Sequence, residues 1–279
     1  MRGIKEFLAP TNIEQVLEML EKYQEKAVIL AGGTHLALVK SSSAEIMIDI
    51  KKANLNYIKE DDNNIIIGAC TRPVDIINND MLKTFADGIL VNAASKMGSK
   101  LTQNLITIGG NIASPFPWSS LPPALLVLEA KVSILSKQKN KIVPLQDLLK
   151  ANPKNFINKN ELITSIIIPK SSKNLKTSYI TLSLTENDYD LVIVAVALLL
   201  ESGICKKAKI ALGSAISPCN TIDHIEPLLI EKKLSKEIIN NVAKESITGL
   251  NLISDFRTTD EHRFEVIKTL VKRALENCM

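Results

Sequence analysis

The sequence predicts an α+β protein of two domains, and three features of the chain support this prediction. The chain opens with a β-α-β pattern whose first strand ends in the glycine pair Gly32-Gly33. A second pair, Gly109-Gly110, follows a β-branched run near the middle of the chain. The C-terminal part reads as strands followed by helices, which is typical of a sheet with a helical layer. A length of 279 residues suffices for both domains.

Composition excludes several classes of protein. Hydrophobic residues make up 46% of the chain and aromatic residues only 4%, so we expect an aliphatic core. The net charge of +4 is small, and no aromatic residues alternate with the basic ones, which argues against a nucleic-acid partner. The longest apolar run, Leu191 to Leu200, is too short to cross a bilayer as a helix, and its β-branched content favours a buried strand.

The N-terminal residues carry the charges of Lys5 and Glu6 and then a capped helix rather than the apolar core of a signal peptide. We therefore expect a cytoplasmic protein with no membrane segment. The cysteines lie far apart and form no CxxC pair, and the histidines show no metal-ligand spacing, so we expect free thiols and no metal site from this chain alone. These residues are Cys70, Cys205, Cys219, Cys278, His35, His224 and His262.

The first fifty residues form the β-α-β opening. Thr11 to Glu14 has the spacing of a capping box, which predicts the start of a helix. The strand Ala27–Ala31 follows and runs into the first glycine pair, and Glu45–Ile50 is the next strand. A loop at the carboxyl end of a strand is where α/β folds usually bind ligands. The loop is not GxGxxG, so a Rossmann site is not the preferred interpretation.

The middle of the chain predicts two hairpins and a helical region. The hairpins join Tyr57–Lys59 to Ile65–Ala69 and Lys131–Leu135 to Lys141–Val143. A helix begins near Arg72-Pro73 and its helical region continues to about Met97. Residues 105–128 then read as a β-branched run, the second glycine pair and a Ser/Pro-rich loop, and are followed by the short helix Leu145–Lys150 and the strand Leu162–Ile168.

A polar segment, KSSKNLK at 170–176, suggests a domain boundary. We place the first domain at 1–172, with subdomains of about 1–53 and 54–172, and the second at 173–279. The second domain is predicted to hold a three-stranded sheet and a helical layer. Its strands are Thr177–Leu184, Leu191–Glu201 and Ala208–Ser214, and its helices are Asp223–Glu231, Ser235–Thr248 and Glu261–Asn277.

The glycine pairs are candidate ligand contacts because a residue without Cβ lets the backbone come close to a bound group. Asn111 adds a donor and an acceptor after the second pair, and Thr34 adds a hydroxyl after the first. One glycine pair alone is more typical of a turn between buried segments. Two pairs of similar design favour a shared binding role.

The order of several motifs resembles the FAD-binding (medium) subunits of molybdenum hydroxylases, the xanthine dehydrogenase and carbon monoxide dehydrogenase flavoprotein family. The segments that carry the resemblance span the whole chain and are AGGTHL, TIGGNIAS, LPPALLVLEAKV, ENDYDLVIVAVAL, KIALGSAISP and ISDFRTTDEHR. The resemblance implies a two-subdomain FAD-binding domain of the vanillyl-alcohol-oxidase (PCMH-like) type, followed by a small α+β domain.

By the same resemblance, FAD lies between the two N-terminal subdomains. Residues 29–36 would wrap its diphosphate with backbone amides, and the second loop would hold the other side and the ribityl chain. Ile163 would line the adenine or ring pocket. The implied cofactor contacts are Ile29, Leu30, Ala31, Gly32, Gly33, Thr34, His35, Leu36, Met97, Gly98, Thr107, Gly109, Gly110, Asn111, Ser114, Ser120 and Ile163.

The family's activity implies an oxidoreductase subunit in a multi-subunit complex. A large partner subunit would hold molybdopterin and oxidise the substrate, and a small partner with two-iron clusters would relay electrons to FAD. The flavin would reduce NAD or another acceptor. The flavin step requires no acid–base residue, so no residue of this chain is predicted to be catalytic.

Some positions differ from the family pattern. Ser120 stands where the family commonly has Asp, and Thr181 and Thr185 stand where Lys, Gln or a basic residue is usual. His35 occupies the acidic position of the first loop, and it is either a protonated partner of the diphosphate or a neutral loop residue. Trp118 either shields the flavin or fills space under its loop. These differences keep two alternatives open: a structural or assembly subunit without flavin redox activity, and a stand-alone flavin reductase.

Overall fold

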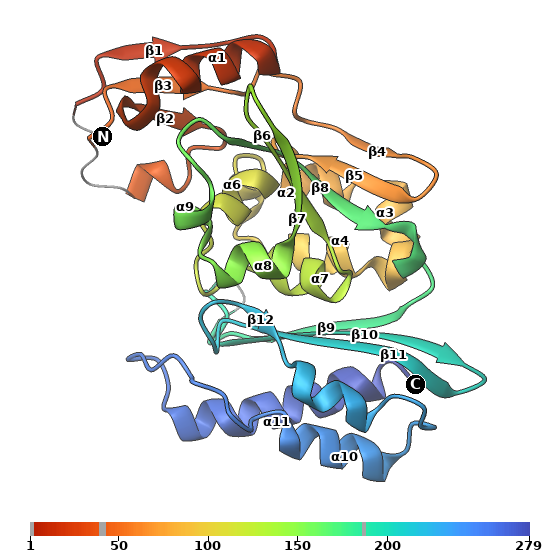
Figure 1. Ribbon diagram of the computed structural model, residues 1–279. Coiled ribbons are helices and arrows are strands. Elements are labelled where there is room, and N and C mark those ends of the chain that lie inside the picture. Colours follow the sequence, from red (N-terminus) through yellow and green to blue (C-terminus); the bar gives the residue numbers. More distant parts are fainter. Residues whose placement is uncertain (1–2, 39–42, 186–187) are drawn as a thin grey trace. The chain divides into compact units, whose positions relative to one another are not determined.

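The structure is a computed structural model that describes residues 3–38, 43–185 and 188–279 (Figure 1). The chain divides into two compact units that interleave along the sequence. The first unit combines Met1–Asp75, Ser99–Pro115 and Ala130–Pro169, and the second combines Ile76–Gly98, Phe116–Glu129 and Lys170–Met279. The division at residue 172 stays a prediction.

A small parallel sheet opens the first unit, in the strand order β1-β3-β2 (Figure 1). The strands are β1 (Glu6–Leu8), β2 (Ala27–Leu30) and β3 (Ile46–Asp49), and helix α1 (Ile13–Tyr23) packs against β2 and β3. The N-cap of α1 is Asn12, whose side chain accepts the N–H of Gln15. Gln15 in turn accepts the N–H of Thr11, so the capping interaction lies one residue beyond the predicted box.

An antiparallel sheet of five strands completes the first unit, in the order β4-β5-β8-β6-β7. Both predicted hairpins are present, as β4–β5 and β6–β7, and β8 lies between them. The strands are β4 (Ile58–Glu60), β5 (Asn64–Gly68), β6 (Lys131–Leu135), β7 (Asn140–Pro144) and β8 (Leu162–Pro169). The helices of this unit's later part are α5 (Lys100–Gln103), α6 (Ile108–Ala113), α8 (Leu145–Lys150) and α9 (Pro153–Phe156).

The helical region expected from Pro73 to Met97 consists of short helices rather than one long helix. Asn79 begins a new helix because its side chain caps the N–H of Leu82, and positive φ angles at Ala86 and Asp87 interrupt the chain again. The helices are α2 (Pro73–Ile77), α3 (Asp80–Thr84) and α4 (Ile89–Ser95).

The second unit is built on an antiparallel sheet in the order β12-β11-β10-β9. Its three long strands correspond to the predicted ones, and Asn220–Thr221 adds a short fourth strand. The predicted helix at 223–231 is instead a 3₁₀ segment, Asp223–Leu228, because Pro227 lies inside it. The other elements are β9 (Lys176–Leu182), β10 (Val192–Glu201), β11 (Ile204–Gly213), α7 (Leu121–Val127), α10 (Lys236–Glu245) and α11 (Asp260–Glu276).

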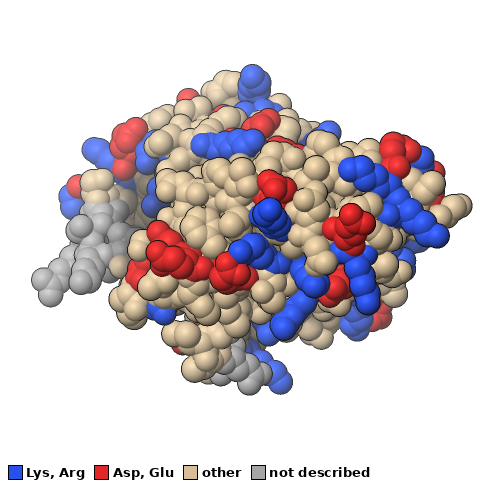
Figure 2. Space-filling view, turned by 90° about the horizontal axis from the view of Figure 1, so that it is seen from below, with Lys and Arg blue, Asp and Glu red and all other residues tan. Residues whose placement is uncertain are grey.

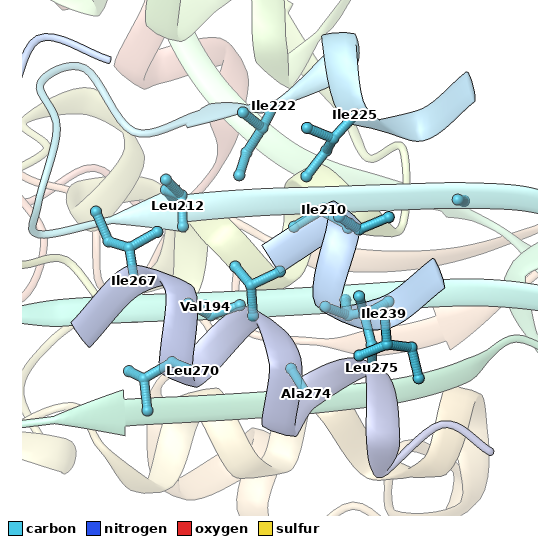
Figure 3. Packing of buried hydrophobic residues seen from close by; sticks show 14 of the residues in the cluster. Val194, Ile210, Leu212, Ile222, Ile225, Ile239, Ile267, Leu270, Ala274 and Leu275 are labelled. Atoms are coloured by element: carbon cyan, nitrogen blue, oxygen red, sulfur yellow. The ribbon is translucent and has the colours of Figure 1, made fainter. Parts of the chain in front are cut away.

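The core of this unit explains why β10 is apolar at nearly every position. Alternate residues such as Val194 pack with Ile210 and with Ile267 and Ala274 of α11 (Figure 3). The residues between them are buried too, and helix α7 contacts both β10 and β11. A strand buried on both faces carries a continuous apolar run rather than an alternating one.

No helix among the described residues is long and apolar enough to cross a membrane. On the face seen in Figure 2, acidic and basic side chains are interspersed, in line with the small net charge of +4. The four cysteines are buried and free. The part of the chain that the structure describes contains no cluster of His, Cys, Asp and Glu able to hold a metal ion.

Candidate cofactor site

The first glycine loop presents consecutive backbone donors. Strand β2 ends at Leu30, and the N–H groups of Gly32, Gly33 and Thr34 have no hydrogen-bond acceptor among the described residues. Gly33 has a φ of +76°, a left-handed conformation that turns successive N–H groups toward one side. Successive amides arranged in this way are suited to binding an anion.

Gly32 has a second role, which is to let two segments of the first unit touch. A Cβ at this position would lie 1.9 Å from the carbonyl oxygen of Leu105 and 3.3 Å from the Cα of Ile106. Any side chain here would therefore collide with the backbone just before the second glycine loop. The first glycine of the pair brings the two predicted loops together, while the second shapes the amide cradle.

His35 follows the cradle and favours its neutral form. Burial lowers the pKa of its imidazole, and the positive charge of Lys154 lowers it further. The choice between the two interpretations of His35 stays a prediction. The hydrogen-bond donors that this loop leaves without an acceptor among the described residues are backbone amides.

The second glycine loop is the first turn of helix α6 and not the end of a strand. Thr107 is the N-cap, and its hydroxyl accepts the N–H of Gly110 at 3.2 Å. The N–H of Ile108 donates to Thr71 O, and the N–H of Gly109 donates to Ala69 O at 2.8 Å. The N–H of Asn111 donates to Thr107 O within the turn. These amides thus have acceptors inside the chain, unlike those of the first loop.

The two glycines of α6 differ in their surroundings. A Cβ on Gly109 would lie 2.6 Å from the Cβ of Ala69, so this position needs glycine for packing. Gly110 is exposed, and a Cβ there would meet only the Thr107 hydroxyl at 2.8 Å. Gly110 is thus the glycine of this loop that leaves open space for a bound group.

The remaining predicted contacts fall in different places. Ser114 is the half-buried C-cap of α6, and Ile163 is a buried residue of β8 in the same unit. Met97, Gly98 and Ser120 belong to the second unit. Ser120 is only 5% exposed; its carbonyl accepts the hydroxyl of Tyr179 at 2.7 Å. The hydroxyl of Ser120 donates to the carbonyl of Lys96 at 3.4 Å, and its role as a cofactor contact stays a prediction.

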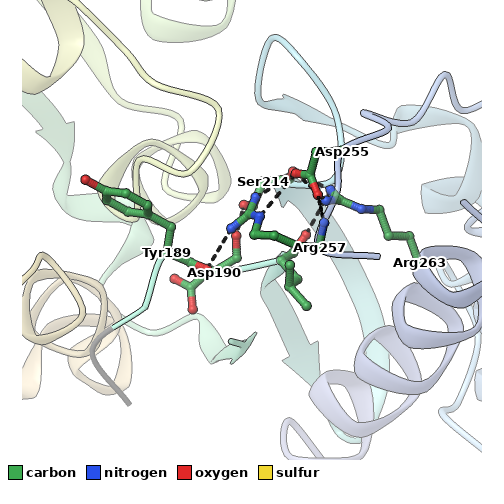
Figure 4. A network of polar contacts seen from close by, with 7 residues as sticks. Tyr189, Asp190, Ser214, Asp255, Arg257 and Arg263 are labelled. Atoms are coloured by element: carbon green, nitrogen blue, oxygen red, sulfur yellow. Dashed lines mark hydrogen bonds and ion pairs between the residues drawn. The ribbon is translucent and has the colours of Figure 1, made fainter. Parts of the chain in front are cut away.

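Two features of the second unit do not stand out from the sequence. Phe116 stacks on Trp118 with ring centroids 5.1 Å apart, and Trp118 lies 4.7 Å from the ring of Tyr189. Near them, Asp255 pairs with Arg257 and Arg263 (Figure 4). The motif ISDFRTTDEHR contains the charged residues of this network, but nothing in its spacing shows that they reach the backbone of residues 189–191.

The parallel opening sheet has a loop with unpaired amides at its carboxyl edge, which is the place where α/β folds usually bind ligands. The family described as "FAD binding domain in molybdopterin dehydrogenase" matches residues 3–171, and "CO dehydrogenase flavoprotein C-terminal domain" matches residues 178–278. The chain therefore belongs to the FAD-binding flavoprotein subunits of the molybdenum hydroxylase family. The resemblance and the fold class inferred from the sequence are confirmed.

Several relatives share almost the whole chain. The glyceraldehyde dehydrogenase medium chain of Sulfolobus acidocaldarius is 29% identical over 97% of this chain and 96% of its own length. The 6-hydroxypseudooxynicotine dehydrogenase complex subunit alpha of Paenarthrobacter nicotinovorans is 28% identical over 98% and 94%. A solved carbon monoxide dehydrogenase from Hydrogenophaga pseudoflava has the same fold, with a TM-score of 0.92 at 24% identity over 99% of this chain and 97% of the other.

The residues of the first unit fit FAD. The amides of Gly32 to Thr34 offer donors to a diphosphate, and the exposed Cα of Gly110 leaves space beside the Thr107 cap. FAD, when bound, supplies the electron and hydride chemistry, and the protein supplies binding and orientation.

Proposed function

We propose that this chain is the electron-transfer flavoprotein of a multi-subunit molybdenum hydroxylase, resembling xanthine dehydrogenase in its organisation. Its partners are a large molybdopterin subunit and a small subunit with two-iron clusters. The chain binds FAD and thereby connects those clusters to NAD or another acceptor. Support comes from the family and from relatives that are named as a medium chain or a complex subunit. The free, buried thiols fit a cytoplasmic, reducing location.

The observation that carries the proposal is the set of amides at Gly32, Gly33 and Thr34. We assign them to the FAD diphosphate, with residues 29–36 around it. From the second loop, Thr107, Gly110, Asn111 and Ser114 would then approach the other side through side chains and a bare Cα, because the amides of Gly109 to Asn111 already have acceptors. The alternative of an assembly subunit is not favoured, since the cradle is intact.

Gly110→Val tests the cofactor assignment. The Cβ of the new side chain meets only the Thr107 hydroxyl, so the variant is expected to fold and to lose FAD. The measurement is flavin absorbance per mole of purified full chain, with the released flavin identified as FAD after denaturation. Ala151→Val, at an exposed C-cap in the same unit, is the control and should retain FAD.

Stoichiometric FAD in Gly110→Val would refute the assignment of the second loop. A colourless wild-type chain that takes up no added FAD would overturn the function itself.

A second experiment addresses the redox role. In the assembled complex, substrate should bleach the flavin of this chain, and NAD or an added acceptor should restore its colour. Flavin that binds but cannot be reduced through the partner subunits would favour the assembly role. Rapid NADH oxidation by the isolated chain with an artificial acceptor would instead favour a stand-alone reductase.

A further inference from the structure

Three aromatic rings of the second unit form a stack that ends at the surface. Phe116 and Trp118 are nearly parallel, with planes 6° apart, and Tyr189 tilts by 33° against Trp118. Because Tyr189 is 58% exposed, burial of its side chain is not enough to keep its ring against Trp118. Trp118 and Tyr189 lie about seventy residues apart in sequence, and neither belongs to a helix or a strand.

A network of polar side chains forms hydrogen bonds to the backbone around Tyr189 (Figure 4). A guanidinium nitrogen of Arg257 donates to the carbonyl of Tyr189 at 3.0 Å. Asp255 holds Arg257 in place through contacts of 2.8 Å and 3.2 Å to the guanidinium and 2.9 Å to the backbone N–H. Arg263, which is fully buried, donates to the same carboxylate at 2.8 Å and to the carbonyl of Leu191.

Ser214 connects this network to the loop that carries Trp118. Its N–H donates to the carbonyl of Pro117 at 2.9 Å, its hydroxyl donates to the carbonyl of Asp190, and its own carbonyl accepts Arg263 at 3.1 Å. Ser214 is 1% exposed and has a φ of 63°, a conformation that a residue other than glycine keeps only when its surroundings enforce it. One residue thus joins the backbones next to both rings.

We infer that Arg257 and Arg263, acting through Asp255 and Ser214, are positioning residues that hold the rings of Trp118 and Tyr189 in contact. Trp118 lies two residues before Ser120, a predicted FAD contact. A link between the ring contact and the cofactor therefore rests on the proposed function, whereas the ring contact itself does not. The ring pair is a preorganised surface on the flavoprotein, and the arginines act on it through backbone carbonyls, without touching either ring.

The electrostatics of Asp255 agree with this arrangement. Burial by itself raises the pKa of its carboxyl, but the hydrogen bonds from Arg257 and Arg263 outweigh that effect and hold the pKa at about 2. The carboxylate therefore stays charged, and the two guanidinium groups stay anchored, throughout the neutral range.

The only tryptophan of the chain makes the inference measurable. Near-ultraviolet circular dichroism and fluorescence of the full chain report Trp118 alone among tryptophans. The difference between wild type and Tyr189→Leu defines the signal of the ring contact. Arg257→Gln should lose more than about half of that signal, because the carbonyl of Tyr189 loses its donor. Arg257→Lys, which keeps a cationic donor, should restore part of it.

Arg72→Gln is the matched control, because Arg72 makes a similar pair with Asp75 at 2.8 Å in the first unit, far from any tryptophan in the sequence. It should leave the Trp118 signal unchanged. Arg263→Met removes the donors to Asp255 and to the carbonyl of Ser214. If that variant does not fold, the Arg257→Gln measurement decides the test. An unchanged Trp118 signal in folded Arg257→Gln would overturn the inference.

These outcomes are independent of the cofactor, since the signal is measured in the full chain after FAD has been removed. A wild type that binds no FAD would sink the proposed function and leave the ring positioning intact. Faster FAD dissociation from Arg257→Gln than from Arg72→Gln would support the link between the ring pair and the cofactor, and equal rates would contradict that link.

Discussion

The two glycines of the first loop are required for different physical reasons. Gly33 has the positive φ that shapes the amide cradle, whereas Gly32 has an ordinary φ but no room for a side chain. The nearest atom to a Cβ at Gly32 is a backbone oxygen, which cannot move away as a flexible side chain would. The sequence motif AGG thus combines a conformational requirement with a packing requirement.

Gly32→Ala should therefore destabilise the protein by about 1–3 kcal/mol or more, since the clash is with backbone. Gly110→Ala adds the same methyl group at an exposed position and should change stability by less than about 1 kcal/mol. Denaturant unfolding of both variants measures the difference. Equal stabilities would contradict the close approach to Leu105.

Asp190 is a buried carboxyl whose protonation depends on folding. Burial raises its pKa from 3.8 to about 6, although a hydrogen bond from Thr181 and the charges of Lys96 and Arg257 oppose the shift. Because the folded-state pKa is the higher one, the folded chain binds more protons than the unfolded chain between these values. Its stabilising contribution is complete below pH 3.8 and is lost as the pH rises through about 6.

Asp190→Asn removes this titration. Relative to wild type, the variant should gain up to about 3 kcal/mol of unfolding free energy as the pH rises from about 4 to 7. Denaturant midpoints across that range, compared between the two proteins, measure the effect. A difference that does not change with pH would show that Asp190 titrates normally in the folded chain.

At the scale of elements, helix α6 replaces the expected strand end because Thr107 caps it, although its two glycines are poor helix formers. Thr107 supplies the cap, and carbonyls of residues 69 and 71 accept the amides of Gly109 and Ile108. Backbone carbonyls from a distant segment thus fix the start of the helix, and its first amides are not available to a ligand.

Thr107→Ala should cost about 1 kcal/mol, because the N–H of Gly110 loses its acceptor. Thr107→Ser keeps a hydroxyl and should retain most of the stability. Chemical denaturation gives the free energies, and FAD content of the same samples shows whether the cap also affects cofactor binding. Equal losses for both variants would point to the methyl group rather than the cap.

At the scale of the whole molecule, each compact unit is built from segments that are not continuous in the sequence. Helix α7 belongs to the second unit, where it contacts β10 and β11, although it lies between segments of the first unit in the sequence. Gly213 lacks room for a Cβ because Pro123 of α7 would lie 2.8 Å from it. The C-terminal sheet is therefore packed against a helix that precedes it by about fifty positions in the sequence.

A fragment of residues 173–279 should consequently fail to fold cooperatively, because it lacks α7 and exposes one apolar face of its sheet. Heat capacity or circular dichroism melting of the fragment measures this, with the full chain as the control. A sharp transition in the soluble fragment would contradict the shared core.

Sequence alone determined the family, the cofactor, the strand identity of the run at 191–200 and the order of most elements, because periodicity and motifs are local. It could not determine that the amides of the second glycine loop are already used, that Gly32 meets Leu105, or that Arg257 and Arg263 reach the backbone beside Tyr189. Each of those depends on contacts between residues distant along the chain, and only tertiary packing decides which distant groups meet.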